Sequence, residues 1–258
     1  PIASSAASDV YKRQAYRTAL ALHGAGAHVV VVDLRRDLKG ELVKAVRAAG
    51  IEVMSGSAVT IAAGTQRIAR VEISPVNEGA TQVLDDPIHM DCDLLAMSGG
   101  LTPAVHLHSQ ARGKLGWDDQ QLCFKPTTVH EASFNAGAGN GVFAADKAIE
   151  NGMQAGTAAA RAAGFDIADG SAPEVAAPAQ SWRPLAAWKV TNGMGEGEGP
   201  KAFVDYQNDV TASDVKLAVR EGYQSVEHVK RYTTLGMATD QGKTSNINGL
   251  AILAESLG

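Results

Sequence analysis

The 258-residue sequence predicts an α/β fold, with a Rossmann-type region followed by a small α-helical unit. Three observations support this prediction. Val29–Val32 is a continuous β-branched run, typical of a parallel strand buried on both faces. Helical and strand patterns alternate around that run. Alanine and glycine are abundant while aromatics make up 5% of the residues, which suits close packing of helices on a sheet.

The first region, residues 15–86, shows the alternation most clearly. The expected elements are helices at 16–23 and 38–49 and strands at 27–33, 52–54, 58–61 and 68–73. This order matches a Rossmann-type half that lacks its first strand and its Gly-x-Gly-x-x-Gly turn. Asp33 ends the β-branched strand, where an acidic residue can bind a ribose hydroxyl. It can equally be a simple strand-end residue.

The leader Pro1–Gln14 is small, polar and unpatterned. We interpret it as a segment that is either not native or disordered, and we exclude it from the fold prediction.

The second region, residues 87–170, contains glycine-bearing turns at the ends of regular elements. A strand at 89–97 runs into Ser98–Gly100, and a helix is expected from Val105. Gly137–Gly141 (GAGNG) then opens an alanine-rich helix at 142–163. Small residues at a helix start let a phosphate or ribose approach the N–H groups and the positive end of the helix dipole. Tight packing on a sheet is the other use of such residues.

Residues 171–200 are rich in Pro, Ala and Gly and predict a linker, in which the stretch 182–188 packs as a strap over a domain surface. Residues 201–258 predict a small helical unit. Thr211 or Ser213 is expected to cap its first helix, with Asp214 in the first turn, and Ser225 to cap the second. A last helix is expected at 247–257.

The run from Lys230 to Asn246 (KRYTTLGMATDQGKTSN) is polar, glycine-bearing and without periodicity. It predicts a loop that offers N–H groups, hydroxyls, Gln241 and Lys243 to an anionic group. The alternative is a plain polar connection between two helices.

Composition excludes several classes of function. A net charge of -5 and a pI of about 5.8 argue against nucleic-acid binding. The absence of a long apolar run and of a signal peptide predicts a cytoplasmic protein without a membrane span. Cys92 and Cys123 are expected to be free thiols. His106 and His108 have no acidic or cysteine partner at ligand spacing, so we expect no metal site.

Several blocks resemble the alpha subunit of heterotetrameric sarcosine oxidase, across Ala15–Gly258. The blocks are Ala15–Leu20, Ser98–Gly100, His106–Gly113, Gly137–Gly141, Lys201–Thr211 (KAFVDYQNDVT) and Glu227–Lys243 (EHVKRYTTLGMATDQGK). The last two are highly specific and the glycine blocks are not. The resemblance implies a partial two-dinucleotide-binding, disulfide-oxidoreductase-like region, followed by a helical domain that resembles a [2Fe–2S]-binding domain.

That family demethylates sarcosine oxidatively to glycine and hydrogen peroxide, passing the methylene group to tetrahydrofolate. Its alpha subunit binds NAD, its beta subunit holds FAD, and FMN lies at the alpha–beta interface; gamma and delta subunits complete the assembly. By this resemblance the chain is a fragment without the first dinucleotide-binding half and without the C-terminal folate-binding domain. The alternative is a non-catalytic scaffold subunit of a related amine or amino-acid dehydrogenase complex.

The resemblance also implies two sets of cofactor-binding residues and no catalytic or metal-ligating residue in this chain. The NAD set is Gly137, Ala138, Gly141, Phe143 and Ala145. The FMN set is Thr233, Thr234, Thr239, Gln241 and Lys243.

The helical unit also resembles a cluster-binding relative with four cysteines. Their positions fall on Asp205, Gln207, Asp240 and Ser245. None of these side chains supplies the thiolate that a [2Fe–2S] cluster needs, so we predict that no iron–sulfur cluster is bound.

Overall fold

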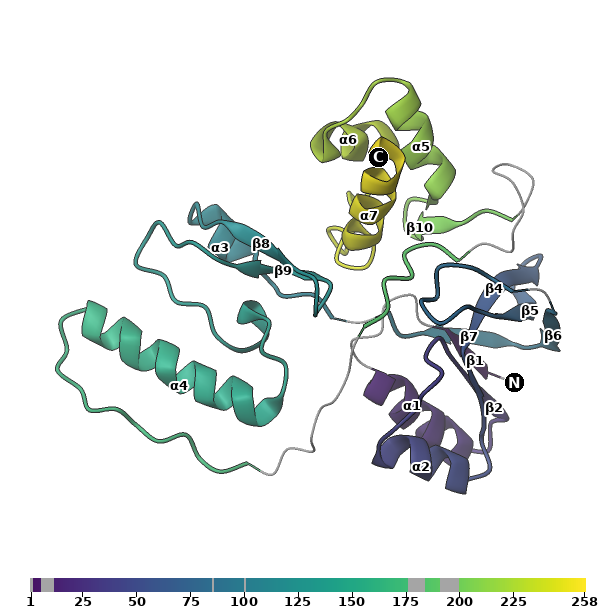
Figure 1. The fold of residues 1–258 in the computed structure, drawn as a ribbon, viewed down its shortest axis with the longest axis horizontal. Coiled ribbons are helices and arrows are strands. Elements are labelled where there is room, and N and C mark those ends of the chain that lie inside the picture. Colours follow the sequence, from purple (N-terminus) through teal and green to yellow (C-terminus); the bar gives the residue numbers. More distant parts are fainter. Residues whose placement is uncertain (1, 6–11, 85, 100, 176–183, 191–199) are drawn as a thin grey trace. The chain divides into compact units, whose positions relative to one another are not determined.

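A computed structural model describes residues 2–5, 12–84, 86–99, 101–175, 184–190 and 200–258 (Figure 1). The chain forms two compact units. The first combines Pro1–Gly100 with Leu185–Gly258, and the second is Leu101–Pro184. The functional division proposed from the sequence, with boundaries at 14, 86, 170 and 200, stays a prediction.

The first unit contains a parallel four-stranded sheet of order β3-β2-β1-β7. Its strands are β1 (Ile2–Ser5), β2 (Val29–Asp33), β3 (Glu52–Ser55) and β7 (Leu94–Met97). All five residues of β2 are buried, as the β-branched run predicts. Helices α1 (Lys12–Gly24) and α2 (Glu41–Ala48) cover one face of the sheet (Figure 1).

The prediction that this half lacks its first strand is wrong. Ile2–Ser5 lies between β2 and β7, with Ile2 paired to Val29 on one side and to Leu94 on the other. Four residues without alternation carry no strand signal of their own, and two parallel neighbours complete the backbone pairing. Residues 6–11 (AASDVY), which follow this strand in the sequence, contain no glycine and lie outside the described residues.

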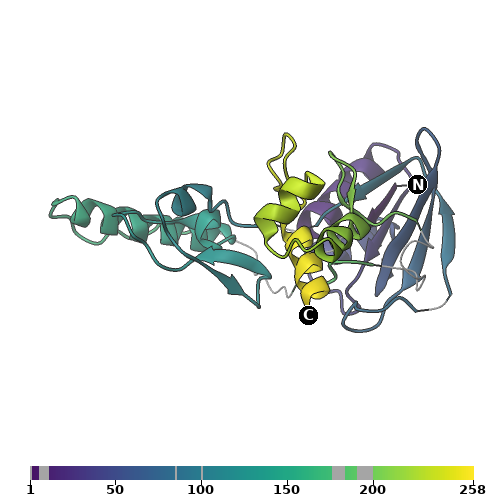
Figure 2. The same cartoon turned by 90° about the horizontal axis from the view of Figure 1, so that it is seen from above.

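An antiparallel sheet of order β4-β5-β6 follows (Figures 1 and 2). It consists of β4 (Ser57–Gly64), β5 (Ile68–Pro75) and β6 (Ile88–Asp91). The single strand expected at 89–97 is therefore divided between β6 and β7, which belong to different sheets. Between them Cys92 is buried with Val32 and Ile73, so this core joins the two sheets.

Within the first unit, the stretch 185–190 packs as a strap over the rest of the unit. Ala187 is buried against Leu34, Ala58 and Val76, and Leu185 and Val190 pack beside it. The expected strap is thus confirmed for its described part; residues 182 and 183, and most of the predicted linker, lie outside the described residues.

The second unit buries few of the side chains that the structure describes in it. Its elements are α3 (His106–Gln110), the hairpin β8 (Leu115–Asp118) and β9 (Cys123–Pro126), the short 3-10 helix η1 (Gly137–Asn140) and α4 (Ala145–Ala162). The hairpin was not predicted. Within the described part of this unit, Cys123 is the one buried hydrophobic side chain apart from Pro103 and Pro184, and no residue of α4 is buried.

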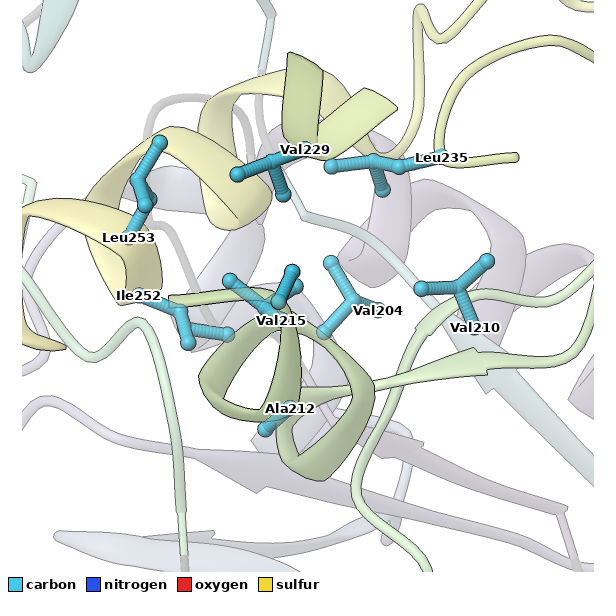
Figure 3. Close-up of a cluster of buried hydrophobic side chains, with 9 residues drawn as sticks. Val204, Val210, Ala212, Val215, Val229, Leu235, Ile252 and Leu253 are labelled. Carbon is cyan, nitrogen blue, oxygen red and sulfur yellow. The ribbon is translucent and has the colours of Figure 1, made fainter. Parts of the chain in front are cut away.

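The C-terminal part of the first unit contains the hairpin β10 (Phe203–Asp205) and β11 (Val210–Thr211), then α5 (Ala212–Arg220), α6 (Val226–Thr233) and α7 (Asn246–Leu257). Thr211, one of the two predicted caps, caps α5 in a reciprocal capping box with Asp214. Ser225 takes the N-cap position of α6 without a side-chain bond. A cluster of nine buried side chains unites these elements (Figure 3): Val204, Val210, Ala212, Val215, Ala218, Val229, Leu235, Ile252 and Leu253.

Candidate functional site: a polar loop held by a buried carboxylate

The polar loop between α6 and α7 is organised around Asp205 at the end of β10. The Asp205 side chain is 2% exposed. Its Oδ1 accepts hydrogen bonds from the backbone N–H groups of Gln207 at 2.9 Å and Asn208 at 3.2 Å. Its Oδ2 accepts from the N–H of Gly236 at 2.8 Å and from Oγ of Ser245 at 3.5 Å. One carboxylate therefore joins three separate stretches of chain.

A second carboxylate shapes the tip of the loop. Asp240 accepts hydrogen bonds from the N–H groups of Gly242 and Thr244, both at 3.0 Å, and from Oγ1 of Thr244 at 2.5 Å. These bonds, with that from the Thr244 hydroxyl the largest, hold the pKa of Asp240 below its ordinary value. The tip is thus a fixed turn whose acid stays charged near neutral pH.

At two positions of the loop, the backbone conformation and the surrounding space favour glycine. Gly236 and Gly242 have φ angles of 66° and 74°, which favour glycine. A Cβ at either position would lie 2.1 or 2.2 Å from Oδ1 of Asn246, so the Asn246 side chain occupies the space that the two glycines leave. This oxygen is buried, and among the described residues it has no hydrogen-bond partner.

The five side chains predicted to meet FMN divide into two groups. Oγ1 of Thr233 donates to the carbonyl of Val229 at 2.7 Å and accepts from the N–H of Leu235 at 3.2 Å, so it ends α6. Thr234 is left-handed, and its hydroxyl donates to the carbonyl of Thr233. Thr234, Thr239, Gln241 and Lys243 are all exposed. Thr239, Gln241 and Lys243 are therefore the exposed side chains that lie beyond the end of α6.

Asp205 is the residue that sequence reasoning missed, since it entered only as one of four substituted cysteine positions. A detectable signal was present: an Asp after a buried Val204 and before Gln207 and Asn208 is typical of a turn in which the side chain binds N–H groups two and three residues on. Its link to Gly236 and Ser245, which lie 31 and 40 residues away, had no local signal.

In the second unit, the predicted NAD-binding residues Gly137, Ala138 and Gly141 lie in a turn that hydrogen bonds and packing hold in place. The N–H of Gly137 donates to Oδ1 of Asn151 on α4 at 3.0 Å. Gly141 is left-handed with φ of 73°, and a Cβ there would lie 2.6 Å from Cε of Lys125. Nζ of Lys125 in turn donates to Oδ2 of Asp118 at 2.7 Å. This hydrogen bond is the main reason that the pKa of Asp118 lies below its ordinary value.

The predicted NAD residues differ in exposure. Ala138 and Ala145 are exposed, Phe143 is half-buried and Gly141 is buried under the Lys125 stem. The first turn of α4 has no side-chain cap from Ala144, so its N–H groups are not closed off by that residue. The turn and the helix start thus offer small side chains and backbone donors together.

Asp33 is not presented to a ribose. Its carboxylate is fully buried and accepts from the Tyr16 hydroxyl at 3.0 Å, from Nη2 of Arg35 at 3.0 Å, and from Nε of Arg35 at 3.2 Å. The alternative reading, a strand-end residue with a structural role, therefore describes Asp33. Beside α1, a cavity of about 290 Å³ runs along the sheet face to the carboxyl end of β7. Its lining is Gln14, Ala15, Thr18, Ala19, Leu22, Val29, Ala96, Met97, Ser98 and Gly99.

The remaining polar candidates have structural roles. Both ring nitrogens of His108 are engaged, Nε2 with the carbonyl of Lys114 at 2.9 Å and Nδ1 with the amide of Asn135 at 3.0 Å. Burial raises the pKa of the Cys123 thiol to about 11, so it is not a reactive thiolate. Within the described residues, no three His, Cys, Asp or Glu side chains gather in a way that could hold a metal ion.

Comparison with known proteins places these features in a family. Residues 199–258 match the model of the sarcosine oxidase A3 domain. The chain is 36% identical over 244 residues to a sarcosine oxidase subunit alpha from Corynebacterium sp. (strain P-1), covering 95% of this chain and 25% of that protein. It is 33% identical over 232 residues to the same subunit of Rhizobium meliloti (strain 1021), covering 84% and 23%.

A solved structure supports the fold. The L-proline dehydrogenase of P. horikoshii matches with a TM-score of 0.55 and 18% identity, over 92% of this chain and 47% of that one. None of the helices in the described residues is long and apolar enough to cross a bilayer.

The chain spans about a quarter of the length of the curated relatives that it matches. It has the predicted α/β architecture, a parallel sheet flanked by helices and, after it, a small helical domain. From these sequence matches we conclude that the chain belongs to the family of sarcosine oxidase alpha subunits.

Proposed function

We propose that this chain is part of an oxidoreductase subunit that takes part in the oxidative demethylation of sarcosine, and that its polar loop contacts FMN at an interface with the beta subunit. In the proposed assembly, FAD lies in the beta subunit, gamma and delta subunits complete the complex, and tetrahydrofolate accepts the methylene group in another domain of the alpha subunit. The flavin supplies the redox chemistry, and this chain supplies binding groups.

The observation that carries the proposal is the exposed group Thr239, Gln241 and Lys243 on a loop fixed by Asp205 and Asp240. A fixed loop loses little entropy on binding, so its donors are preorganised. Lys243 would place a positive charge beside a flavin, which favours the reduced, more negative form. Gln241 already donates Nε2 to the carbonyl of Ala238 at 3.0 Å, which orients the amide and leaves its Oε1 available as an acceptor.

The Gly137–Gly141 turn fits one wall of an NAD site. Small residues let a nucleotide approach the backbone, and the first turn of α4 adds N–H groups and the positive end of an 18-residue helix dipole. Ala138, Phe143 and Ala145 are the side chains proposed to line it. Asp146 in the first turn would repel a phosphate, so we place the ribose and not the phosphates nearest to it.

A scaffold is the second candidate function, and one observation favours it. The acidic residue at the end of β2 is sequestered by Arg35 and Tyr16, so this carboxylate is not free to bind a ribose. In this reading the chain is a dinucleotide-binding fold that holds partner subunits and binds no cofactor.

The two functions are separated by replacing the exposed loop donors in the intact assembly. The full-length subunit carrying Gln241→Ala and Lys243→Met is co-expressed with its beta partner, and Ser213→Ala on the exposed side of α5 is the matched surface control. The cofactor function predicts lower FMN content, measured by visible absorbance, and slower turnover in the double variant alone. Wild-type flavin content and turnover in both variants would support the scaffold.

A further inference from the structure

We propose that Asp205 is the positioning residue of the loop proposed to contact FMN: it sets the shape of residues 233–245 without touching a ligand itself. This inference rests on the proposed function for its biological meaning. Its physical content, a loop held by one buried carboxylate, stands on the contacts of Asp205 alone.

The hydrogen bonds of Asp205 reach both ends of the loop. The two bonds to Gln207 and Asn208 are local and close the turn between β10 and β11. The two bonds to Gly236 and Ser245 reach the beginning and the end of the loop. Asn208, whose backbone Asp205 holds, adds a bond from Nδ2 to the carbonyl of Thr234 at 2.9 Å. The loop is therefore fastened to the β10–β11 turn at both of its ends.

The burial of Asp205 makes these bonds strong. A carboxylate that is 2% exposed is costly to bury unless its oxygens accept hydrogen bonds. Hydrogen bonds to a charged group are about twice as strong as neutral ones. The bond to Gly236 is the shortest of the four at 2.8 Å, so it is the strongest attachment of the loop.

The neighbouring residues hold the loop in other places. Asp240 binds Gly242 and Thr244, which belong to its own turn. Leu235 inserts into the apolar core beside Val204, the residue before Asp205 (Figure 3). The core thus fixes one point of the loop, and Asp205 fixes the backbone on both sides of its exposed donors.

The isosteric change Asp205→Asn tests the inference in the 258-residue chain. Its amide oxygen can still accept from Gln207 and Asn208, and its NH₂ group can donate to Oγ of Ser245, but the N–H of Gly236 then faces a second donor. We expect amide hydrogen exchange of residues 233–245 to accelerate about tenfold or more, with exchange in α5 changed less than about twofold.

The matched control is Asp209→Asn, which makes the same change on an exposed residue of the same turn. Asp209 is left-handed with φ of 53°, a conformation that Asn tolerates, so we expect exchange within about twofold of wild type throughout. Ser245→Ala removes the longest of the four bonds and should accelerate exchange less than Asp205→Asn does. If Asp205→Asn leaves loop exchange unchanged, or accelerates α5 as much as the loop, Asp205 is not a positioning residue.

The failure of this inference and of the proposed function are distinguishable. Faster loop exchange in Asp205→Asn, together with wild-type flavin content in the Gln241/Lys243 double variant, would keep the positioning role and discard the flavin contact. Unchanged loop exchange with reduced flavin content in the double variant would do the reverse.

Discussion

The C-terminal helical domain and the second unit differ in how many apolar side chains they bury. Residues 201–258 contain a cluster of nine buried side chains, Val215 and Ile252 among them, and the polar loop between α6 and α7 is attached to that core through Leu235. Apart from prolines, residues 101–184 have a single buried hydrophobic side chain among those described, while Leu107 is 79% and Phe165 66% exposed. The first region therefore has a packed apolar core, while the described part of the second keeps several large apolar side chains exposed.

This difference bears on the two proposed cofactor contacts. A loop on a packed core is rigid before a ligand arrives, as the bonds of Asp205 illustrate. A glycine turn such as Gly137–Gly141 is held by hydrogen bonds and by the Lys125 stem, but no residue of the neighbouring α4 is buried beneath it. We therefore expect the conformation of the Gly137–Gly141 turn to depend on the rest of the subunit more than the conformation of the polar loop does.

The largest expected effect tests this contrast directly. Ile252→Ala removes a side chain that is 1% exposed in the helical core, and should destabilise the C-terminal domain by about 2–5 kcal/mol. Leu107→Ala removes a side chain exposed in the second unit, and should change stability by no more than about 0.5 kcal/mol. Denaturant-dependent hydrogen exchange, followed in α5 and in α3, measures both. An equal cost for the two variants would remove the contrast between the regions.

A smaller effect tests whether the capping box contributes to this core. Thr211→Ala deletes the hydroxyl that accepts from the N–H of Asp214 at 3.2 Å and donates to its Oδ2 at 2.7 Å. We expect a loss of about 1 kcal/mol, measured by the same exchange experiment in α5. Ser225→Ala at the N-cap of α6 is the control, because Ser225 makes no side-chain cap bond there, and it should lose less. Equal losses at both caps would contradict the assigned role of the box.

The elements that the sequence predicted are those with a clear local pattern, and the elements that it missed have none. The buried strand β2, the helices around it and a cap at Thr211 or Ser213 were predicted, because each has a strong local pattern. The strand Ile2–Ser5 was not, since its place is decided by pairing with β2 and β7. The β8–β9 hairpin was also missed, because Leu115–Asp118 and Cys123–Pro126 are short and carry no clear alternation.

The candidate site was predictable to a similar degree. Thr239, Gln241 and Lys243 are exposed on a loop, as a polar stretch without periodicity predicts. Thr233 was assigned to the ligand, yet its hydroxyl ends α6. The role of Asp205 depends on partners 31 and 40 residues away, and a single sequence does not show which distant N–H groups a carboxylate will meet. The absence of an iron–sulfur cluster stays a prediction, which an iron assay on the purified protein tests.

The central claim is that Lys243 brings a positive charge to a flavin shared with the beta subunit. The measurement that tests it most directly is the reduction potential of the FMN in the full complex, compared between wild type, Lys243→Met and Lys243→Arg. Because a nearby cation favours the reduced flavin, we predict a more negative potential in Lys243→Met and a potential close to wild type in Lys243→Arg. The same potential in all three proteins would contradict the claim.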